Sequence, residues 1–235
     1  MKIIFLHGFP DNSLSWSQQL AHFGGTHQCH APTIHSLKNQ QQLEKIMELV
    51  GTEQAVLVGH DMGGVAAVDF ALTFPDKVKH LVLINTMSLA MFAHRLKGFD
   101  QLLRSSYMSV FANPLVNRKF FGRFTKTFLK YAYDLGGLPS HDPLRESGAE
   151  VLDGLAQYKE LALRLPRELF ELRSKVPVPT TVIFGKKDPF LAAPTERELQ
   201  RFFGRFTLHA VNAGHWPHRT DADEVNGIIA AAIAD

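Results

Sequence analysis

Short, strongly apolar runs recur along this chain, and most are followed at once by glycine, proline or small polar residues. Runs of about four to eight residues rich in Val, Ile, Leu and Phe are typical of buried strands in a parallel sheet. The pattern predicts six such strands, at residues 2–6, 27–31, 55–59, 80–85, 180–184 and 206–211. Because parallel strands need a long crossover between them, the intervening segments are expected to contain helices.

Three of the intervening segments have a helical pattern. The first has apolar residues at the i, i+3, i+4, i+7 spacing of one helical face, namely Leu43, Ile46, Met47 and Val50. Residues 63–74 are small and apolar, and Pro75 ends them. The last helix carries its apolar face at Val225, Ile228, Ile229, Ala232 and Ile233. Strands that alternate with helices predict an α/β protein with a mainly parallel sheet flanked by helices.

The alternation stops between residues 89 and 175, where the pattern predicts several helices and no strand. The apolar residues at helical spacing are Leu103, Tyr107, Val110 and Phe111, then Phe120, Phe124 and Phe128, then Val151, Leu155 and Tyr158. Breakers at residues 136–143 predict a loop within this block. Because open α/β sheets bind ligands outside the carboxyl ends of their strands, we expect residues 89–175 to form a helical cap there. The core domain then comprises residues 1–88 and 176–235.

Composition and charge narrow the class of protein. A chain of 235 residues, with 45% hydrophobic and 20% charged residues, is typical of one soluble globular domain with an insertion. A net charge of +2 argues against a nucleic-acid partner. With Cys29 as its one cysteine the chain forms no intrachain disulfide, and no apolar run is long enough for a signal sequence or a membrane span. We therefore expect a cytoplasmic protein without a membrane partner.

The most informative local motif follows the third predicted strand. Residues 59–63 read Gly-His-Asp-Met-Gly, which is the G-x-S-x-G turn of a nucleophile elbow with aspartate in place of serine. The flanking Gly59 and Gly63 leave room for the backbone in this tight turn. Asp61 can attack a saturated carbon and form an alkyl-enzyme ester, which water then cleaves. The competing interpretation, in which Asp61 only caps the next helix, does not explain the paired glycines.

Two further candidate residues lie at the ends of later strands. Asp188 follows the fifth predicted strand, and His215 follows the sixth. Nucleophile, acid, histidine is the chain order described for α/β-hydrolases. We predict a triad in which Asp188 orients His215, and His215 removes a proton from the water that cleaves the ester on Asp61. His218 is a weaker candidate for the base, and His60 is expected to have a positional role.

These segments resemble the α/β-hydrolase superfamily from His7 through His218, and within it the aspartate-nucleophile branch of epoxide hydrolases and dehalogenases. The backbone N–H groups of Phe9 and Met62 lie where this fold places an oxyanion hole. The family usually has two strands before its His-Gly segment, and this chain starts almost at that segment. Residues 33–36 read Thr-Ile-His-Ser where the family commonly has Asp-x-Arg-Gly, so we expect this loop to pack differently.

The residues around the nucleophile distinguish the members of this branch. Resemblance to haloalkane dehalogenases would require Asn or Glu after His-Gly and Trp after the aspartate, but this chain has Phe9 and Met62 there. Resemblance to fluoroacetate dehalogenases would require arginines after the nucleophile, and residues 62–65 contain none. The His-Gly-Phe-Pro segment of epoxide hydrolases is present unchanged. The branch that the chain is most similar to is therefore the epoxide hydrolases.

Two tyrosines strengthen this resemblance. Residues 107–114 reproduce a Tyr-x-x-x-Phe-x-x-Pro stretch of that family, and Tyr158 precedes a lysine as in its second tyrosine segment. The resemblance implies that Tyr107 and Tyr158 hydrogen-bond the epoxide oxygen. Phenols with a pKa near ~10 can donate to a developing alkoxide at neutral pH. The alternative is that both are ordinary core tyrosines.

The sequence as a whole predicts a hydrolase that opens a small apolar epoxide with water to a vicinal diol, without a metal or an organic cofactor. The residues expected to contact the substrate are Tyr107, Tyr158, Phe9 and Trp216. One alternative is a dehalogenase or another hydrolase with the same triad. The other is a non-catalytic ligand-binding homologue, although a binder has no physical need for a complete triad. The substrate, the attacked carbon and the oligomeric state stay open.

Overall fold

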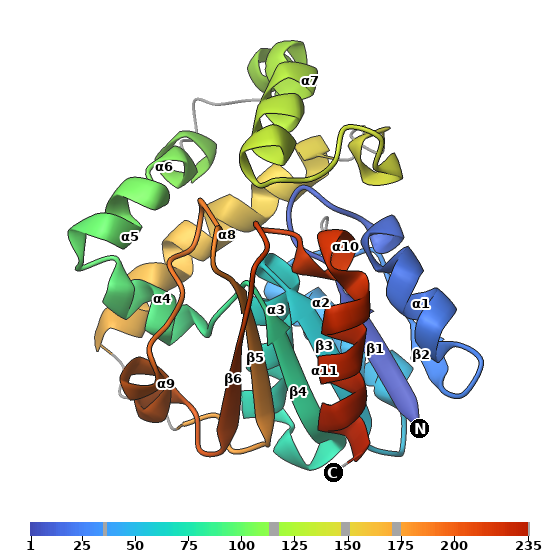
Figure 1. Ribbon diagram of the computed structural model, residues 1–235. Helices are drawn as coiled ribbons and strands as arrows, with labels where there is room; N and C mark the ends of the chain where they lie inside the picture. Colours follow the sequence, from blue (N-terminus) through green and yellow to red (C-terminus); the bar gives the residue numbers. More distant parts are fainter. Residues whose placement is uncertain (35–36, 113–117, 147–150, 171–174, 235) are drawn as a thin grey trace.

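The computed structural model describes residues 1–34, 37–112, 118–146, 151–170 and 175–234 (Figure 1). In this part of the chain, six parallel strands form one sheet: β1 (Lys2–Leu6), β2 (Gln28–His30), β3 (Ala55–His60), β4 (Val78–Ile84), β5 (Thr180–Gly185) and β6 (Phe206–Val211). All six predicted strands are confirmed, and each bound differs from the prediction by no more than two residues.

The strand order places the predicted motifs at one point of the sheet. The order is β2-β1-β3-β4-β5-β6, so the chain leaves β1 on one side and returns to its other side. β1 pairs in parallel with both β2 and β3. The carboxyl ends of β1 and β3 therefore form a topological switch point, where open α/β sheets bind ligands. The His-Gly-Phe-Pro segment follows β1, and the elbow with Asp61 follows β3.

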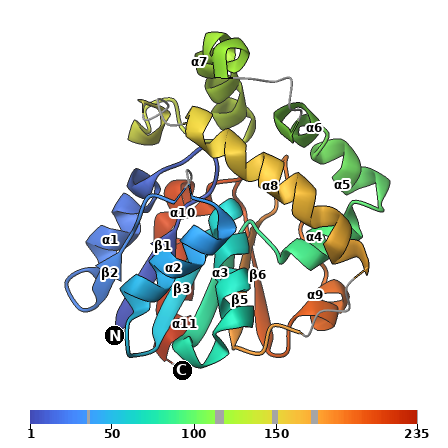
Figure 2. The ribbon, with the colours of Figure 1, turned by 180° about the vertical axis from the view of Figure 1, so that it is seen from behind.

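Helices cover both faces of the sheet (Figure 1 and Figure 2). One face packs against α1 (Ser17–Phe23) and α11 (Ala222–Ala234), and the other packs against α2 (Asn39–Val50) and α3 (Met62–Thr73). The shorter core elements are η1 (Ser13–Trp16), η2 (Pro75–Lys77), α9 (Glu196–Phe202) and α10 (Pro217–Thr220). The three helices predicted in the core segments are present as α2, α3 and α11.

The alternation of side chains along each strand divides the core into two layers. In β1, Ile4 and Leu6 pack with the residues of α2 and α3, whereas Ile3 and Phe5 pack with those of α1 and α11. All four side chains are fully buried. Because both faces of the sheet are covered, a central strand needs apolar residues at every position, which explains the continuous apolar runs in the sequence.

The long segment between β4 and β5 is helical, as predicted. Its elements, called the inserted helices below, are α4 (Leu89–Arg95), α5 (Phe99–Arg104), α6 (Tyr107–Ala112), α7 (Arg118–Leu135), η3 (Pro143–Glu146) and α8 (Val151–Phe170). No strand occurs among the residues of this segment that are described. Figure 1 shows α6, α7 and α8 over the end of the sheet opposite the two chain termini. Residues 136–142 form the predicted loop between α7 and η3.

The apolar positions predicted in the inserted helices do not all pack inward. Leu103 is 63% exposed and Phe124 is 52% exposed, whereas Leu129 and Tyr133 form the buried side of α7. Five of the predicted apolar side chains are not among those that the structure describes, namely Val110, Phe111, Phe120, Val151 and Leu155. Helical spacing alone therefore did not distinguish the packed side of these helices from the exposed side.

The loop after β2 is anchored by backbone hydrogen bonds. Ile34 is buried, and its N–H donates to His7 Nε2 at 3.0 Å. The Ile34 carbonyl accepts from the side-chain amides of Gln42 and Gln157. Because His7 Nε2 accepts a hydrogen bond, the ring proton is on Nδ1, which faces the Gly8 carbonyl at 2.8 Å. Residues 35–36 of the same loop lie outside the described part of the chain.

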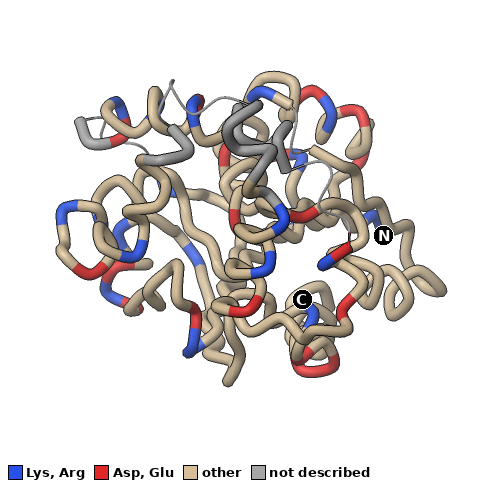
Figure 3. Tube along the Cα trace, turned by 90° about the horizontal axis from the view of Figure 1, so that it is seen from above, with Lys and Arg blue, Asp and Glu red and all other residues tan. Residues whose placement is uncertain are grey.

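Basic and acidic residues are mixed along the described part of the chain (Figure 3). Figure 3 shows Lys and Arg interspersed with Asp and Glu around the Cα trace. None of the helices described is long and apolar enough to cross a membrane.

The turn from β3 into α3 is strained and closely packed. Asp61 has φ 47° and ψ −120°, a conformation that residues other than glycine rarely adopt. A Cβ on Gly59 would lie 2.5 Å from the Cα of Gly64, and one on Gly63 would lie 2.2 Å from the Leu6 carbonyl oxygen. Both flanking glycines are therefore required by the space that the neighbouring backbone leaves.

We expect Gly63→Ala to destabilise the protein, because the added methyl group meets the carbonyl oxygens of Leu6 and His7 at 2.2 and 2.4 Å. The free energy of unfolding should fall by about 1–3 kcal/mol, which urea denaturation measures. Gly227→Ala is the matched control, because a Cβ at Gly227 in α11 has no neighbour within 4 Å. Its alanine should stabilise the helix by up to ~1 kcal/mol. Equal stability of the two variants would contradict this account of the elbow.

Candidate active site

Asp61 stands at the start of α3, but its carboxylate makes no capping hydrogen bond to that helix. The carboxylate is turned toward the end of β1, where the backbone N–H of Phe9 donates to Asp61 Oδ2 at 3.0 Å. A Cβ on Gly8 would lie 2.5 Å from Asp61 Cβ, so glycine at this position allows the two segments to approach. The interpretation of Asp61 as a simple helix cap is therefore wrong. Met62 follows at the first position of α3, where its N–H stays a predicted oxyanion donor.

The structure brings Asp188 and His215 together. His215 Nδ1 donates to Asp188 Oδ2 at 2.8 Å, and both side chains are buried. The other carboxylate oxygen, Oδ1, accepts the backbone N–H groups of Phe190 and Leu191 at 2.8 and 3.2 Å. Because both oxygens of Asp188 are engaged, the carboxylate has a fixed orientation and holds the His215 ring in turn.

The backbone of His215 is fixed on both sides. Its N–H donates to the carbonyl of Gly136, in the loop after α7, at 2.9 Å. Its carbonyl accepts His60 Nε2 at 2.8 Å. The ring lies edge-on to Phe190 and Trp216, with centroid distances of 5.0 and 4.8 Å. His60 therefore contacts the histidine of the predicted triad directly, and the inserted helices contribute to its position.

Charge at the site favours the protonated form of His215. Burial lowers the pKa of His215, but the nearby carboxylates of Asp188, Asp61 and Asp11 more than offset this effect and raise it to about 9. The hydrogen bond to Asp188 contributes in the same direction. This pKa favours an imidazolium beside the carboxylates at neutral pH.

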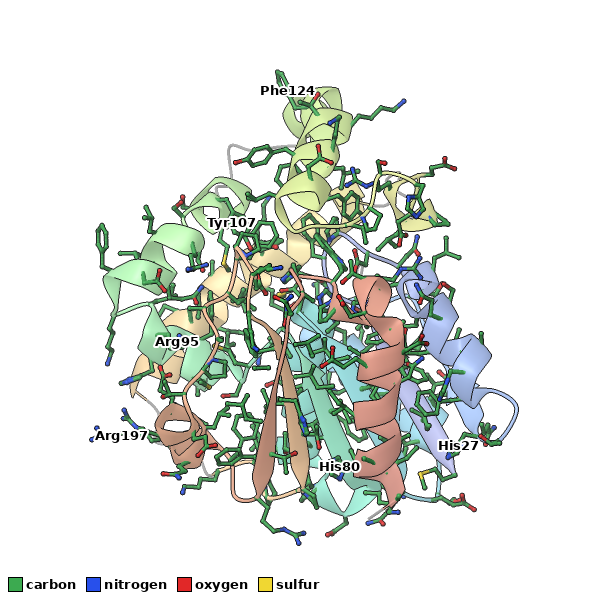
Figure 4. The ribbon with its side chains drawn as sticks, in the orientation of Figure 1. His27, His80, Arg95, Tyr107, Phe124 and Arg197 are labelled. Atoms are coloured by element: carbon green, nitrogen blue, oxygen red, sulfur yellow. The ribbon has the colours of Figure 1, made fainter. Side chains whose placement is uncertain are left out.

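Tyr107 and Tyr158 lie beside Asp61. Both tyrosines and Asp61 line two adjoining cavities, of about 240 Å³ and about 40 Å³. The two phenols hydrogen-bond each other, and their ring centroids are 6.4 Å apart. Burial raises the pKa of each hydroxyl, so both stay protonated at neutral pH. Figure 4 shows Tyr107 between the inserted helices and the ends of the strands.

The larger cavity is lined mostly by aromatic rings. Phe9 and Trp216, both predicted to contact the substrate, line it together with Phe190 and His215. Phe9 packs edge-on against Tyr158 at 4.9 Å. The Trp216 indole N–H donates to Asp11 Oδ2 at 2.9 Å, which holds its ring in place. A cavity with apolar walls and a few convergent polar groups is typical of a site for a small apolar ligand.

Asn85 is a structural contributor that sequence reasoning missed. It follows β4, has φ 43°, and its amide donates to the Gly214 carbonyl at 2.9 Å. Its amide oxygen accepts the Gly185 N–H at 2.7 Å, so Asn85 joins the segments that carry Asp188 and His215. The sequence signal that could have indicated this role was the position of Asn85 at the end of a predicted strand. Its uncharged amide belongs to no catalytic motif, so its role was not predicted.

A second feature that was missed is a buried cluster around Asp11, which includes His60 and His218. Asp11 Oδ2 accepts the Ser15 hydroxyl and the Trp216 indole, and lies 3.6 Å from His60 Nδ1. His218 Nε2 is hydrogen-bonded to Ser15 Oγ, and burial strongly lowers the His218 pKa. His218 does not line the cavity that Asp61 and His215 share, so the geometry favours His215 as the base. Among the described residues, Asp11, His60 and His218 are the group whose ligand atoms, all within 4.8 Å, could hold a metal ion.

The fold and this arrangement define an α/β-hydrolase, and comparison with known proteins agrees. Residues 3–228 match the family described as the alpha/beta hydrolase family, and the chain belongs to that family. It is a hydrolase, as the sequence predicts.

The similar proteins include several that are named epoxide hydrolases. The chain is 27% identical over 260 residues to epoxide hydrolase 3 of Xenopus tropicalis, covering 97% of this chain and 70% of that protein. Its structure is similar to that of a Bacillus megaterium epoxide hydrolase bound to an inhibitor, with a TM-score of 0.81, 24% identity and coverage of 100% and 93% of the two chains. The latter likeness concerns the fold alone.

We expect the pKa of His215 to fall below about 9 in Asp61→Asn, because loss of that carboxylate removes one of the charges that stabilise the imidazolium. NMR titration of the histidine ring resonances measures the change, and the spectrum of His215→Gln assigns the signal. Asp134→Asn is the control, since this exposed carboxylate pairs with Lys130 and Arg145 instead. An unchanged pKa in Asp61→Asn would contradict the electrostatic coupling.

Proposed function

We propose that this hydrolase opens epoxides to vicinal diols through an ester formed on Asp61. The observation that carries the proposal is the arrangement around one apolar cavity. A carboxylate at the elbow, a His–Asp pair and two protonated phenols all face it. The epoxide hydrolase names of the similar proteins support the same reaction.

In the first step, a carboxylate oxygen of Asp61 forms a bond to one epoxide carbon, and the bond from that carbon to the ring oxygen breaks. The ring oxygen takes a proton from Tyr107 or Tyr158, so no free alkoxide leaves. Because Asp61 Oδ2 already accepts the Phe9 N–H, Oδ1 is the oxygen that we assign to the attack. The product is a hydroxyalkyl ester on Asp61.

In the second step, water cleaves the ester. Ester formation removes the charge of Asp61, which is one of the charges that raise the pKa of His215. The imidazolium then returns a proton to the phenolate that the first step left, and the neutral ring is available as a base. His215 takes a proton from water, Asp188 stabilises the resulting imidazolium, and the hydroxide adds to the ester carbonyl. The developing oxyanion is Asp61 Oδ2, which the Phe9 N–H already contacts at 3.0 Å. The adduct then collapses as the bond from the carbonyl carbon to the alkoxide oxygen breaks. That oxygen takes the proton of the added hydroxyl group, so the diol leaves and Asp61 is again a carboxylate beside the His215 imidazolium.

The inserted helices serve in this proposal as a cap, residues 89–175, over the core domain of residues 1–88 and 176–235. They supply both tyrosines and the Gly136 carbonyl that holds the His215 backbone. Asp142 of the same segment forms a buried ion pair with Arg219 of α10, with contacts of 2.8 to 3.1 Å. The cap is therefore part of the site and also limits access of water to it.

The two alternative functions find less support in the geometry. A dehalogenase releases halide, which needs no proton donor, so the paired protonated phenols beside Asp61 would have no role. A non-catalytic binder has no need for a His215–Asp188 pair that is buried and fixed by backbone donors.

We expect His215→Gln to accumulate the ester when it is incubated with small aliphatic and aryl epoxides. The nucleophile remains, but the base that activates water is lost. Intact-protein mass spectrometry should show an added mass equal to the whole epoxide, and peptide mapping should place it on Asp61. The double variant Asp61→Asn/His215→Gln is the control and should remain unmodified. An adduct only from haloalkanes would replace the proposal by dehalogenation, and no adduct from either panel would overturn it.

We expect Tyr107→Phe and Tyr158→Phe each to slow ring opening by about 10²-fold or more, because each removes a proton donor to the ring oxygen. Cleavage of the preformed ester should be much less affected, and single-turnover kinetics separates the two steps. Tyr133→Phe is the matched control, since Tyr133 is a buried tyrosine of α7 that lines neither cavity. Equal effects of all three substitutions would contradict the assigned role.

A further inference from the structure

Asp11, His60 and His218 form a buried cluster that the proposed reaction does not use. Asp11 is 1% exposed, and both histidines are fully buried. One ligand atom of each residue lies within 4.8 Å of those of the other two. Three atoms of the cluster make no hydrogen bond to any described residue, namely Asp11 Oδ1, His60 Nδ1 and His218 Nδ1. Buried polar atoms without a hydrogen bond are rare in proteins, so three of them in one cluster require an explanation.

Hydrogen bonds on the other side of each imidazole ring fix where its proton is. His60 Nε2 lies 2.8 Å from the carbonyl oxygen of His215, which can only accept, so Nε2 carries the proton. The Ser15 hydroxyl donates to the Asp11 carboxylate, so the Ser15 oxygen accepts from His218 Nε2 at 2.8 Å. In the neutral form of each ring, Nδ1 therefore has a free lone pair. Two imidazole nitrogens and one carboxylate oxygen, all acceptors, meet in the cluster.

A metal ion satisfies all three acceptors, whereas a proton or one water molecule does not. A proton on His60 Nδ1 would face Asp11 Oδ2 at 3.6 Å, which is longer than a hydrogen bond, and would leave His218 Nδ1 without a partner. A water molecule can donate to two of the three atoms. A divalent cation binds the lone pairs of all three, and the Asp11 carboxylate cancels half of its charge. Imidazole nitrogens and carboxylate oxygens are common ligands of zinc.

We propose that Asp11, His60 and His218 bind a Zn²⁺ ion with a structural role. Tetrahedral zinc with bonds of about 2.0–2.2 Å holds its ligand atoms roughly 3.3 Å apart. His60 Nδ1 and Asp11 Oδ2 are already 3.6 Å apart, so binding draws the side chains only slightly together. Histidines that bind metals almost always donate their second N–H to a fixed oxygen, as His60 does to the His215 carbonyl.

Gln19 provides a further acceptor beside this cluster. Its amide nitrogen donates to the His218 carbonyl and to Asn226 Oδ1, at 2.9 and 3.0 Å. Its amide oxygen is buried and makes no hydrogen bond to a described residue. We assign this oxygen to the fourth position of the tetrahedron, which it fills directly or through a metal-bound water molecule.

The ion would join three segments that are remote in sequence. Asp11 lies in the loop after β1, His60 ends β3 and His218 belongs to α10, which packs against η1 and α1 (Figure 1). The same segments carry residues of the candidate active site, but none of the three ligands lines the cavities that contain Asp61. The zinc therefore stabilises the arrangement without contacting a substrate, and the proposal does not rest on the proposed reaction.

The metal content of the unchanged protein tests the site. Because the ligands are buried, the ion enters as the chain folds, so the protein is unfolded with a chelator and refolded with or without Zn²⁺. Elemental analysis after removal of free ion should find one zinc per chain. The unfolding temperature should rise by roughly 5–10 °C when free zinc is about a hundredfold above its Kd. Protein from cells grown with added zinc allows the same analysis without refolding. Folded protein without zinc from both preparations would overturn the proposal.

Spectroscopy identifies the occupant of the cluster. Protein refolded with Co²⁺ should show the intense visible absorption of tetrahedral cobalt, whereas hydrated cobalt absorbs weakly. The weak spectrum alone would refute a site with nitrogen and oxygen ligands. An NMR signal of His60 with protons on both ring nitrogens, in protein exposed to zinc, would assign a proton to the cluster and overturn the metal site.

Matched variants locate the ion. His218→Gln should lose it, because one of the three ligands is removed. Ser15→Ala keeps all three ligands but removes the acceptor of the His218 N–H, so zinc affinity should fall about 10–100-fold. His22→Gln/His27→Gln is the control and should bind zinc normally, because these histidines of α1 and the turn after it lie outside the cluster. Circular dichroism verifies the fold of each variant. Zinc that the control loses and that Ser15→Ala and His218→Gln retain would place the ion elsewhere and refute the proposal.

Discussion

The N–H group of Phe9 can donate to the Asp61 carboxylate only because glycine lets the ends of β1 and β3 approach each other closely. A Cβ at Gly8 or Gly63 would collide with the opposite segment, so the whole arrangement depends on this one narrow contact. The strained backbone of Asp61 is a consequence of the same contact. It turns the carboxylate away from the helix that follows and toward the cavity, where its charge acts on His215. Geometry and electrostatics at the site therefore have a common origin.

Buried polar groups hold the remaining segments in register with this contact. His60, the residue before Asp61, supports the backbone of His215, and Asn85 links the segments of Asp188 and His215. Asp11, which lies two residues after Phe9, accepts a hydrogen bond from the indole of Trp216. Each of these bonds joins residues that are remote in sequence, and each satisfies a polar group that would be costly to bury alone. These hydrogen bonds explain how the loops after β1, β3, β5 and β6 keep the site residues in a fixed arrangement.

The inserted helices complete the wall of the cavity at the site. They bring Tyr107 and Tyr158 over Asp61, and burial there keeps both phenols protonated. The same helices carry exposed apolar residues on α7 next to the cavity mouth. In the proposed reaction one segment therefore supplies the proton donors and limits the access of water to the site.

The sequence by itself determined the strands, three of the core helices and the elbow, because apolar periodicity and glycine spacing are local properties. It also indicated Asp61, Asp188 and His215 as partners, since the carboxyl ends of parallel strands must meet at one edge of a sheet. It did not reveal Asn85 or the cluster of Asp11, His60 and His218, whose roles arise from hydrogen bonds across many residues of separation. Nor did it separate the packed side of α7 from the exposed Phe124 and Tyr131, because helical spacing records a face but not what covers it. Only the tertiary structure decides which apolar side chains are buried, since burial is a property of the assembled layers.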